Sequence, residues 1–165
     1  MNHAMGIDWG VLMGPSLADK NAHHDIHDAA HTEMDAGTEV LLMSVSSGDD
    51  RTALRVAFAL TDGWQQRVLA HADAEEEDLF PQVLARFPAQ AAAVAALRRD
   101  HELLRLLVGE VRQVLEQEGK VTPSVLSRFS ALLHLQRLHS DFEEQRFLPE
   151  IATVTRSSHR SSKEE

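Results

Sequence analysis

Two stretches of the chain place a histidine four residues before a glutamate. His71 precedes Glu75 and His139 precedes Glu143, and in both stretches a second glutamate, two apolar residues and a proline follow at matching positions. Residues i and i+4 of a helix lie one turn apart on the same face, so each pair directs an imidazole and a carboxylate to one point. Imidazole and carboxylate groups bind divalent cations. The repeat therefore predicts a duplicated two-helix unit with a metal-binding role.

Histidines on the other two predicted helices extend this set. His101 is the one histidine of residues 88–118, and it lies roughly 50° from the centre of the apolar stripe of that helix, at the edge of the core face. The first helix offers four candidates: His23, His24, His27 and His31. His27 has the same angle to its own apolar stripe, and its distance from the turn between the first two helices matches that of His71. We therefore select His27, with His31 as the first alternative. His23 shares the same face but lies one helical turn too far from the loop that follows this helix.

The predicted layer across the bundle contains four imidazoles and two carboxylates: His27, His71, Glu75, His101, His139 and Glu143. Burying such groups without partners would cost several kcal/mol for each charge. A pair of divalent cations removes this cost if each takes two histidines and each glutamate bridges both, because paired ions lie about 3.5–4 Å apart. Ligands without sulfur favour iron, followed by manganese or zinc. The alternative is a buried polar network without metal.

The elements that position these residues are helices. Capping and turn residues predict helices over 16–45, 51–87, 88–118 and 122–151, with a kink or an end at Pro81. Short loops between them make neighbouring helices antiparallel, which predicts an all-α, up-down-up-down four-helix bundle. We expect the bundle to span residues 16–152. Residues 1–15 form an N-terminal arm that packs on the bundle or binds a partner, and residues 153–165 form a disordered tail.

Composition excludes several functions. The chain has 165 residues and a formal net charge of −10, which argues against nucleic acid as a partner. The absence of cysteine excludes disulfides, thiolate metal sites and cysteine nucleophiles. We see neither a stretch of about 20 apolar residues that could span a membrane nor a secretory signal, so we expect a cytoplasmic protein without a membrane partner. The oligomeric state stays open.

The order of the motifs resembles that of haemerythrin-like proteins of the HHE cation-binding family. The resemblance covers roughly residues 16–152 and rests on the order His27, His71 with Glu75, His101, His139 with Glu143. It implies a non-haem centre of two iron ions with the four histidines as terminal ligands and the two glutamates as bridges. Oxygen-carrying haemerythrins have a second histidine four residues after the third-helix ligand, where this chain has Arg105. On the fourth helix they have an aspartate five residues after the histidine, whereas this chain has Glu143 four residues after His139.

Three functions are compatible with these residues. The first is a binding protein or sensor for a small diatomic ligand such as O2 or NO. The second is an enzyme at the same centre that decomposes hydrogen peroxide or donates iron for iron–sulfur repair. The third is a helical interaction module that holds little metal. His31 or His23, each one turn from His27, is an added or replacement ligand in the first two cases.

Overall fold

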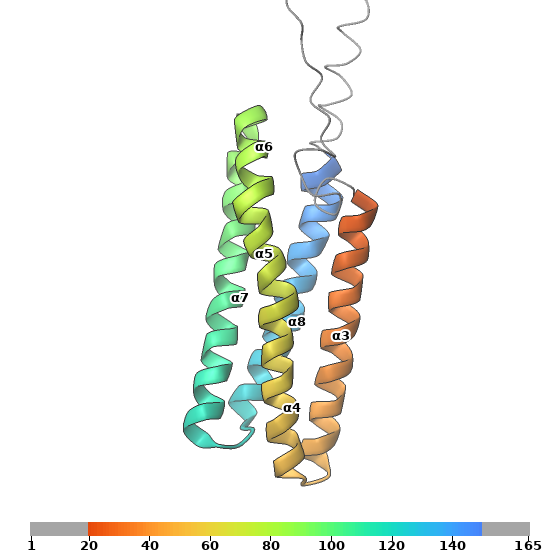
Figure 1. The fold of residues 1–165 in the computed structure, drawn as a ribbon, viewed down its shortest axis with the longest axis vertical. Coiled ribbons are helices and arrows are strands. Elements are labelled where there is room, and N and C mark those ends of the chain that lie inside the picture. Colours follow the sequence, from red (N-terminus) through yellow and green to blue (C-terminus); the bar gives the residue numbers. More distant parts are fainter. Residues whose placement is uncertain (1–19, 150–165) are drawn as a thin grey trace, which may run out of the picture.

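The computed structural model describes residues 20–149, which form long antiparallel helices with no strand among them (Figure 1). The predicted arm over 1–15 and the predicted tail over 153–165 lie outside the described residues. So do the predicted start of the first helix at Ser16 and the predicted end of the last helix near Ile151. The prediction of an all-α, up-down-up-down four-helix bundle is confirmed. No helix among the described residues is long and apolar enough to cross a membrane.

Four helical rods make up the bundle. The first is α3 (Lys20–Ser46). The second is a continuous series of segments: α4 (Asp50–Gly63), η1 (Trp64–Leu69), α5 (Ala70–Ala74), η2 (Glu75–Leu79) and α6 (Phe80–Arg86). A short 3-10 turn, η3 (Pro88–Gln90), leads into the third rod, α7 (Ala91–Glu118). The fourth rod is α8 (Pro123–Phe142) followed by η4 (Glu143–Phe147).

The ends of the rods follow the local sequence. The Asp49 side chain accepts a hydrogen bond from the Thr52 backbone N–H at the start of α4. At the same end of the bundle, α7 stops at Gly119, whose φ of 62° is accessible to glycine at little cost. Pro88 was expected at the first position of the third helix; it instead opens the 3-10 turn, and the α-helix begins three residues later.

Thr122 gives a test of this capping. Its side chain accepts a hydrogen bond from the Val125 backbone N–H at the start of α8. Thr122→Ala should lower the free energy of unfolding by about 1 kcal/mol, because that N–H loses its partner. Thr122→Ser keeps the hydroxyl and should stay close to the parent in urea denaturation. Equal losses for both variants would show that the methyl group matters and the cap does not.

Both copies of the histidine–glutamate motif run into a π-helical turn. The turn begins at Glu75 in η2 and at Glu143 in η4, and the residue that follows each segment donates its backbone N–H to the carbonyl of that glutamate, five residues earlier. A proline comes next in both copies, at Pro81 and Pro149. Proline has no N–H and its ring crowds the carbonyl four residues earlier, which a wider turn relieves. Pro81 therefore widens the second rod, which continues to Arg86.

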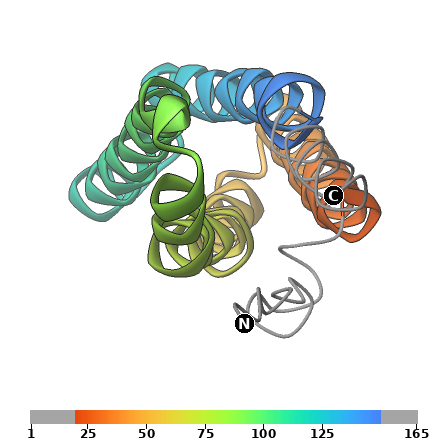
Figure 2. The same ribbon diagram turned by 90° about the horizontal axis from the view of Figure 1, so that it is seen from above.

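Each rod packs against two others: α3 lies beside α4 and α8, and α7 also lies beside α4 and α8. Figure 2 shows this arrangement from above. The interior has two separate apolar clusters. The larger cluster, at the end with the two hairpin turns, includes Leu41, Trp64, Leu115 and Phe129. The smaller one, at the opposite end, consists of Leu79, Phe80, Val83, Val94, Leu97 and Phe147. Between the two clusters lies a layer of buried polar side chains.

Candidate metal centre

This layer brings together five histidines and two glutamates from all four rods. They are His23 and His27 on α3, His71 and Glu75 on the second rod, His101 on α7, and His139 and Glu143 on the fourth rod. The side chains of His23, Glu75 and Glu143 are fully buried, and that of His71 keeps 14% of its surface exposed. All six residues predicted for the layer are therefore in it, and His23 joins them.

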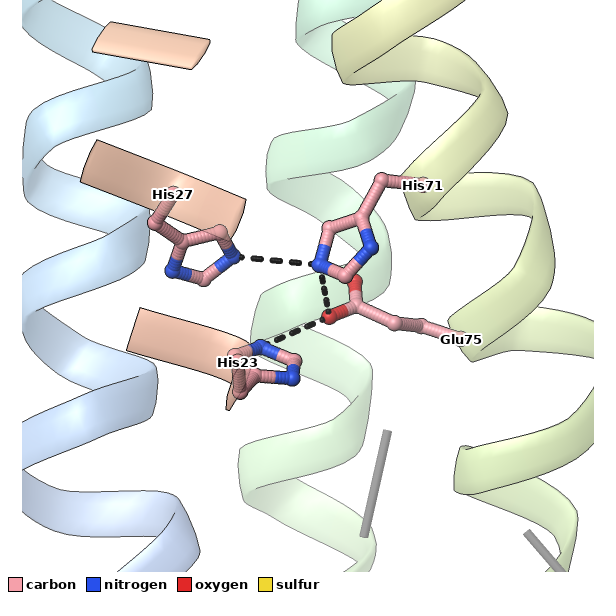
Figure 3. Close-up of side chains that lie close together, drawn as sticks. All are labelled: His23, His27, His71 and Glu75. Carbon is pink, nitrogen blue, oxygen red and sulfur yellow. Dashed lines mark hydrogen bonds and ion pairs between the residues drawn. The ribbon is translucent and has the colours of Figure 1, made fainter. Parts of the chain in front are cut away.

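Three histidines surround one oxygen of Glu75 (Figure 3). The Nε2 atoms of His71 and His23 lie 3.0 and 3.1 Å from Glu75 Oε1. His27 Nε2 is 3.2 Å from His71 Nε2. One ligand atom from each of these four residues lies within 4.8 Å of every other, which is the spacing of groups that share one cation.

A second group forms around the other oxygen of Glu75. His101 Nε2 lies 3.3 Å from Glu75 Oε2 and 3.2 Å from His139 Nε2. Glu75 therefore offers one oxygen to each group. Glu143 also faces both groups, since its Oε2 atom is 3.0 Å from His23 Nε2 and 3.7 Å from His139 Nε2. The arrangement suits two cations with carboxylates between them.

The chemistry of the donors fits metal better than a closed network of hydrogen bonds. The Nε2 atoms of His27 and His71 lie 3.2 Å apart, and so do those of His101 and His139. Between two neutral imidazoles at this distance there must be either a proton, carried by one of the two nitrogens, or a cation that both nitrogens bind. Both oxygens of Glu75 and Oε1 of Glu143 are buried without an aligned hydrogen-bond donor. The nitrogens near Glu75 are within ion-pair distance of it but do not point an N–H at it. Two cations, one in each group, would give the imidazole lone pairs and the Glu75 oxygens a partner.

Without metal, the two histidines of α3 are driven to opposite charge states. Burial disfavours the charged form of His23, but the hydrogen bond to Glu143 and the contact with Glu75 outweigh this effect and raise the pKa of His23 to about 10. Burial, together with the positive charges of His23 and His71, lowers the pKa of His27 to about 2. A metal ion replaces the proton on a ligating imidazole, so metal binding to this layer releases protons.

The pKa values of the two layer glutamates also shift in opposite directions. Burial on its own would raise the pKa of Glu75, but contacts with His101, His23 and His71 hold it well below its usual range. Burial and the negative charge of Glu75 raise the pKa of Glu143. Two carboxylates in one buried layer repel each other when both are ionised, so the second one ionises less readily.

The glutamates that follow the two layer glutamates hold the outer nitrogens of two histidines. Glu144 Oε1 lies 2.8 Å from His27 Nδ1, and Glu76 Oε1 lies 2.8 Å from His101 Nδ1. If each Nδ1 carries the proton and donates it to the carboxylate, the Nε2 lone pair is free to face the layer. Arg105, at the position of the extra histidine of oxygen carriers, donates to Glu76 over 3.0 Å and stays outside the layer.

From the sequence, His23 is predicted to lie one helical turn too far from the hairpin turn to join the layer, and the structure corrects this prediction. Its ring centroid lies 4.5 Å from that of His27 and 4.9 Å from that of His71. His31, the preferred alternative, is outside both groups, with Nε2 3.2 Å from Ser140 Oγ. The sequence does contain a signal for His23. His23 lies one helical turn farther from the hairpin turn than His27, just as Glu75 lies one helical turn farther from it than His71, so His23 and Glu75 are at the same height in the bundle.

His23→Ala should therefore lower the metal content by about one ion per chain. The variant removes a ligand from the group around Glu75 Oε1 and leaves the group of His101 and His139 intact. Elemental analysis of reconstituted protein measures the effect. His24→Ala, which removes the exposed neighbouring histidine, and His31→Ala should both keep the full metal content. A drop for His31→Ala with none for His23→Ala would reverse the assignment.

The fold and the buried layer together define a four-helix bundle with a cation site built from histidine and carboxylate. Comparison with known families agrees, since residues 22–151 match the Hemerythrin HHE cation binding domain. The chain therefore belongs to this haemerythrin family of metal-binding proteins. No curated protein and no solved structure gave a significant match.

Proposed function

We propose that the chain is a non-haem di-iron protein that binds a small diatomic ligand such as O2 or NO. The observation that supports this most is the sharing of Glu75, which gives one oxygen to each of two groups of candidate ligands. Two ions held in this way lie within the span of a single carboxylate. Imidazole and carboxylate ligands without sulfur suit iron.

The proposed ligands divide unequally between the two ions. His23, His27, His71 and Glu75 would hold one ion, and Glu75, His101 and His139 would hold the other. The smaller group leaves more of its ion open to a further ligand. Bound iron would supply the electrons and the open coordination positions that binding of O2 or NO requires.

A small cavity adjoins the two groups, and this supports a small ligand. Its volume is about 20 Å³, which is room for one molecule of the size of water or a diatomic. His71, His101 and His139 line it, together with apolar side chains that include Val68 and Leu104. These apolar side chains reduce the contact between water and a molecule held beside the ligands.

The test is a metal count followed by a ligand titration. Protein reconstituted anaerobically with ferrous iron should hold about two ions per chain. After reduction, exposure to O2 should produce an absorption band in the visible that disappears when O2 is removed, and NO should produce a different spectrum. Less than about one metal ion per chain would instead support a structural helical module.

Decomposition of hydrogen peroxide is a second candidate, and one feature favours it. The Glu144 carboxylate contacts the exposed ring of His24 at 2.7 Å and the buried ring of His27 at 2.8 Å, so titratable groups connect the surface to the layer. Such a connection suits a reaction that moves protons. Sustained O2 evolution from peroxide added to the iron-loaded protein would favour the enzyme, and its absence would favour the binding protein.

A further inference from the structure

The cavity beside the metal centre lies on one definite side of the histidine layer. Each rod contributes a lining residue one turn closer to the hairpin turns than its own layer histidine: Ala30, Val68, Leu104 and Gln136. The apolar cluster at the opposite end contributes none of the lining. A ligand in this cavity therefore meets the layer from the side of the larger apolar cluster and touches residues that the layer itself does not use.

Gln136 is the unusual member of this lining. It is 3% exposed, and its Oε1 atom is buried without a hydrogen-bond partner. The other two polar side chains that line the cavity outside the histidine–glutamate layer have protein partners: Ser140 contacts His31, and Arg67 pairs with Glu33. A buried amide oxygen without a partner destabilises the fold, and an apolar side chain of similar shape would avoid this.

An amide can serve a ligand in two ways. The side chain of glutamine has a carbonyl that accepts and an NH2 group that donates, and a half-turn about its last torsion exchanges them. Gln136 comes three residues before His139 on α8, so the two side chains lie on the same face of that helix. Both line the cavity. A small molecule in the cavity would have one atom near His101 and His139, which we call its inner atom. The Gln136 amide is placed to form a hydrogen bond with the atom at its other end, the outer atom.

We propose that Gln136 is a specificity-determining residue that hydrogen-bonds the small molecule held beside the metal centre. This inference rests on the proposed function, since it requires a ligand in the cavity. With its NH2 group turned toward the ligand, the amide favours small molecules whose outer atom carries negative charge or accepts a hydrogen bond. A ligand with an apolar outer atom gains nothing from the amide.

The experiment uses Gln136→Leu and Gln136→Met in the full chain, with azide as the probe. Both variants should hold as much iron as the parent, because Gln136 belongs to neither ligand group. The dissociation constant of azide for the oxidised protein, measured by absorption, should rise about tenfold, the loss of one hydrogen bond to a charged group. The melting temperature of the metal-free variants should stay equal to the parent or rise, because an unpaired buried amide is gone.

Gln117→Leu, which changes an exposed glutamine on α7, is the control and should leave all three quantities unchanged. Unchanged azide affinity in either variant that binds iron like the parent would overturn the proposal. Lower iron content would also overturn it, since Gln136 would then act on the layer and not on the ligand. A parent protein that takes up no iron, or that takes it up and binds neither azide nor O2, would instead refute the proposed function.

Discussion

Glu75→Gln should reduce the bound metal from about two ions per chain to less than one. The carboxylate lies with Oε1 beside His23 and His71 and with Oε2 beside His101, so its loss weakens both groups of ligands. The amide has nearly the same shape, but it has no charge and its NH2 group cannot bind a cation. Elemental analysis after reconstitution measures the loss, and circular dichroism should show that the helices remain.

Glu77→Gln is the matched control, because Glu77 lies in the same π-helical segment and its side chain is exposed. It removes the same charge two residues away and should keep the full metal content. If Glu75→Gln binds two ions with the affinity of the parent, Glu75 does not bridge the ions. The layer would then have to hold metal through Glu143 and the histidines alone.

The sequence predicted the fold and most of the layer for a physical reason. Helical periodicity relates His71 to Glu75 and His139 to Glu143 without any knowledge of tertiary structure, because i and i+4 always share a face. Short turns then fix which rods are antiparallel, and equal distances from a shared turn align His27 with His71 and His101 with His139. The roles of these residues as ligands remain predictions.

The level of His23 was missed because the comparison matched histidines with histidines. The layer is two turns thick on the second and fourth rods, where the glutamates lie one turn beyond the histidines. An antiparallel neighbour must supply a residue at that second level too, and on α3 this residue is His23, whose Nε2 is 3.1 Å from Glu75 and 3.0 Å from Glu143. Matching the glutamates as well as the histidines would have found it.

The π-helical turns were missed for a different reason. Periodicity and capping do not distinguish a hydrogen bond to the fourth preceding residue from one to the fifth, since both continue the same rod. The available signal was the proline six residues after each layer glutamate, present in both copies at Pro81 and Pro149. A proline in a helix predicts a kink or an end, whereas in the structure the widened turn accommodates the proline and begins at the glutamate that faces the histidines.

Removing the metal should lower the melting temperature by roughly 10–20 °C. A ligand that binds the folded state alone stabilises it by about 4 kcal/mol when its free concentration is a thousand times its dissociation constant. The metal-free layer keeps three buried oxygens of Glu75 and Glu143 without aligned donors, so contacts within the unloaded layer replace only part of this gain. Calorimetry of loaded protein and of protein dialysed against a chelator measures the difference.

The free concentration of metal gives this prediction a second test. The melting temperature should rise steadily as free ferrous iron is increased above the dissociation constant, and Glu75→Gln should lose most of this rise. The metal-free protein should still unfold in one cooperative step, because the apolar cluster around Trp64 and Phe129 packs without help from the layer. An unchanged melting temperature on chelation would mean that the histidines and glutamates satisfy one another, and the layer would then be a structural network.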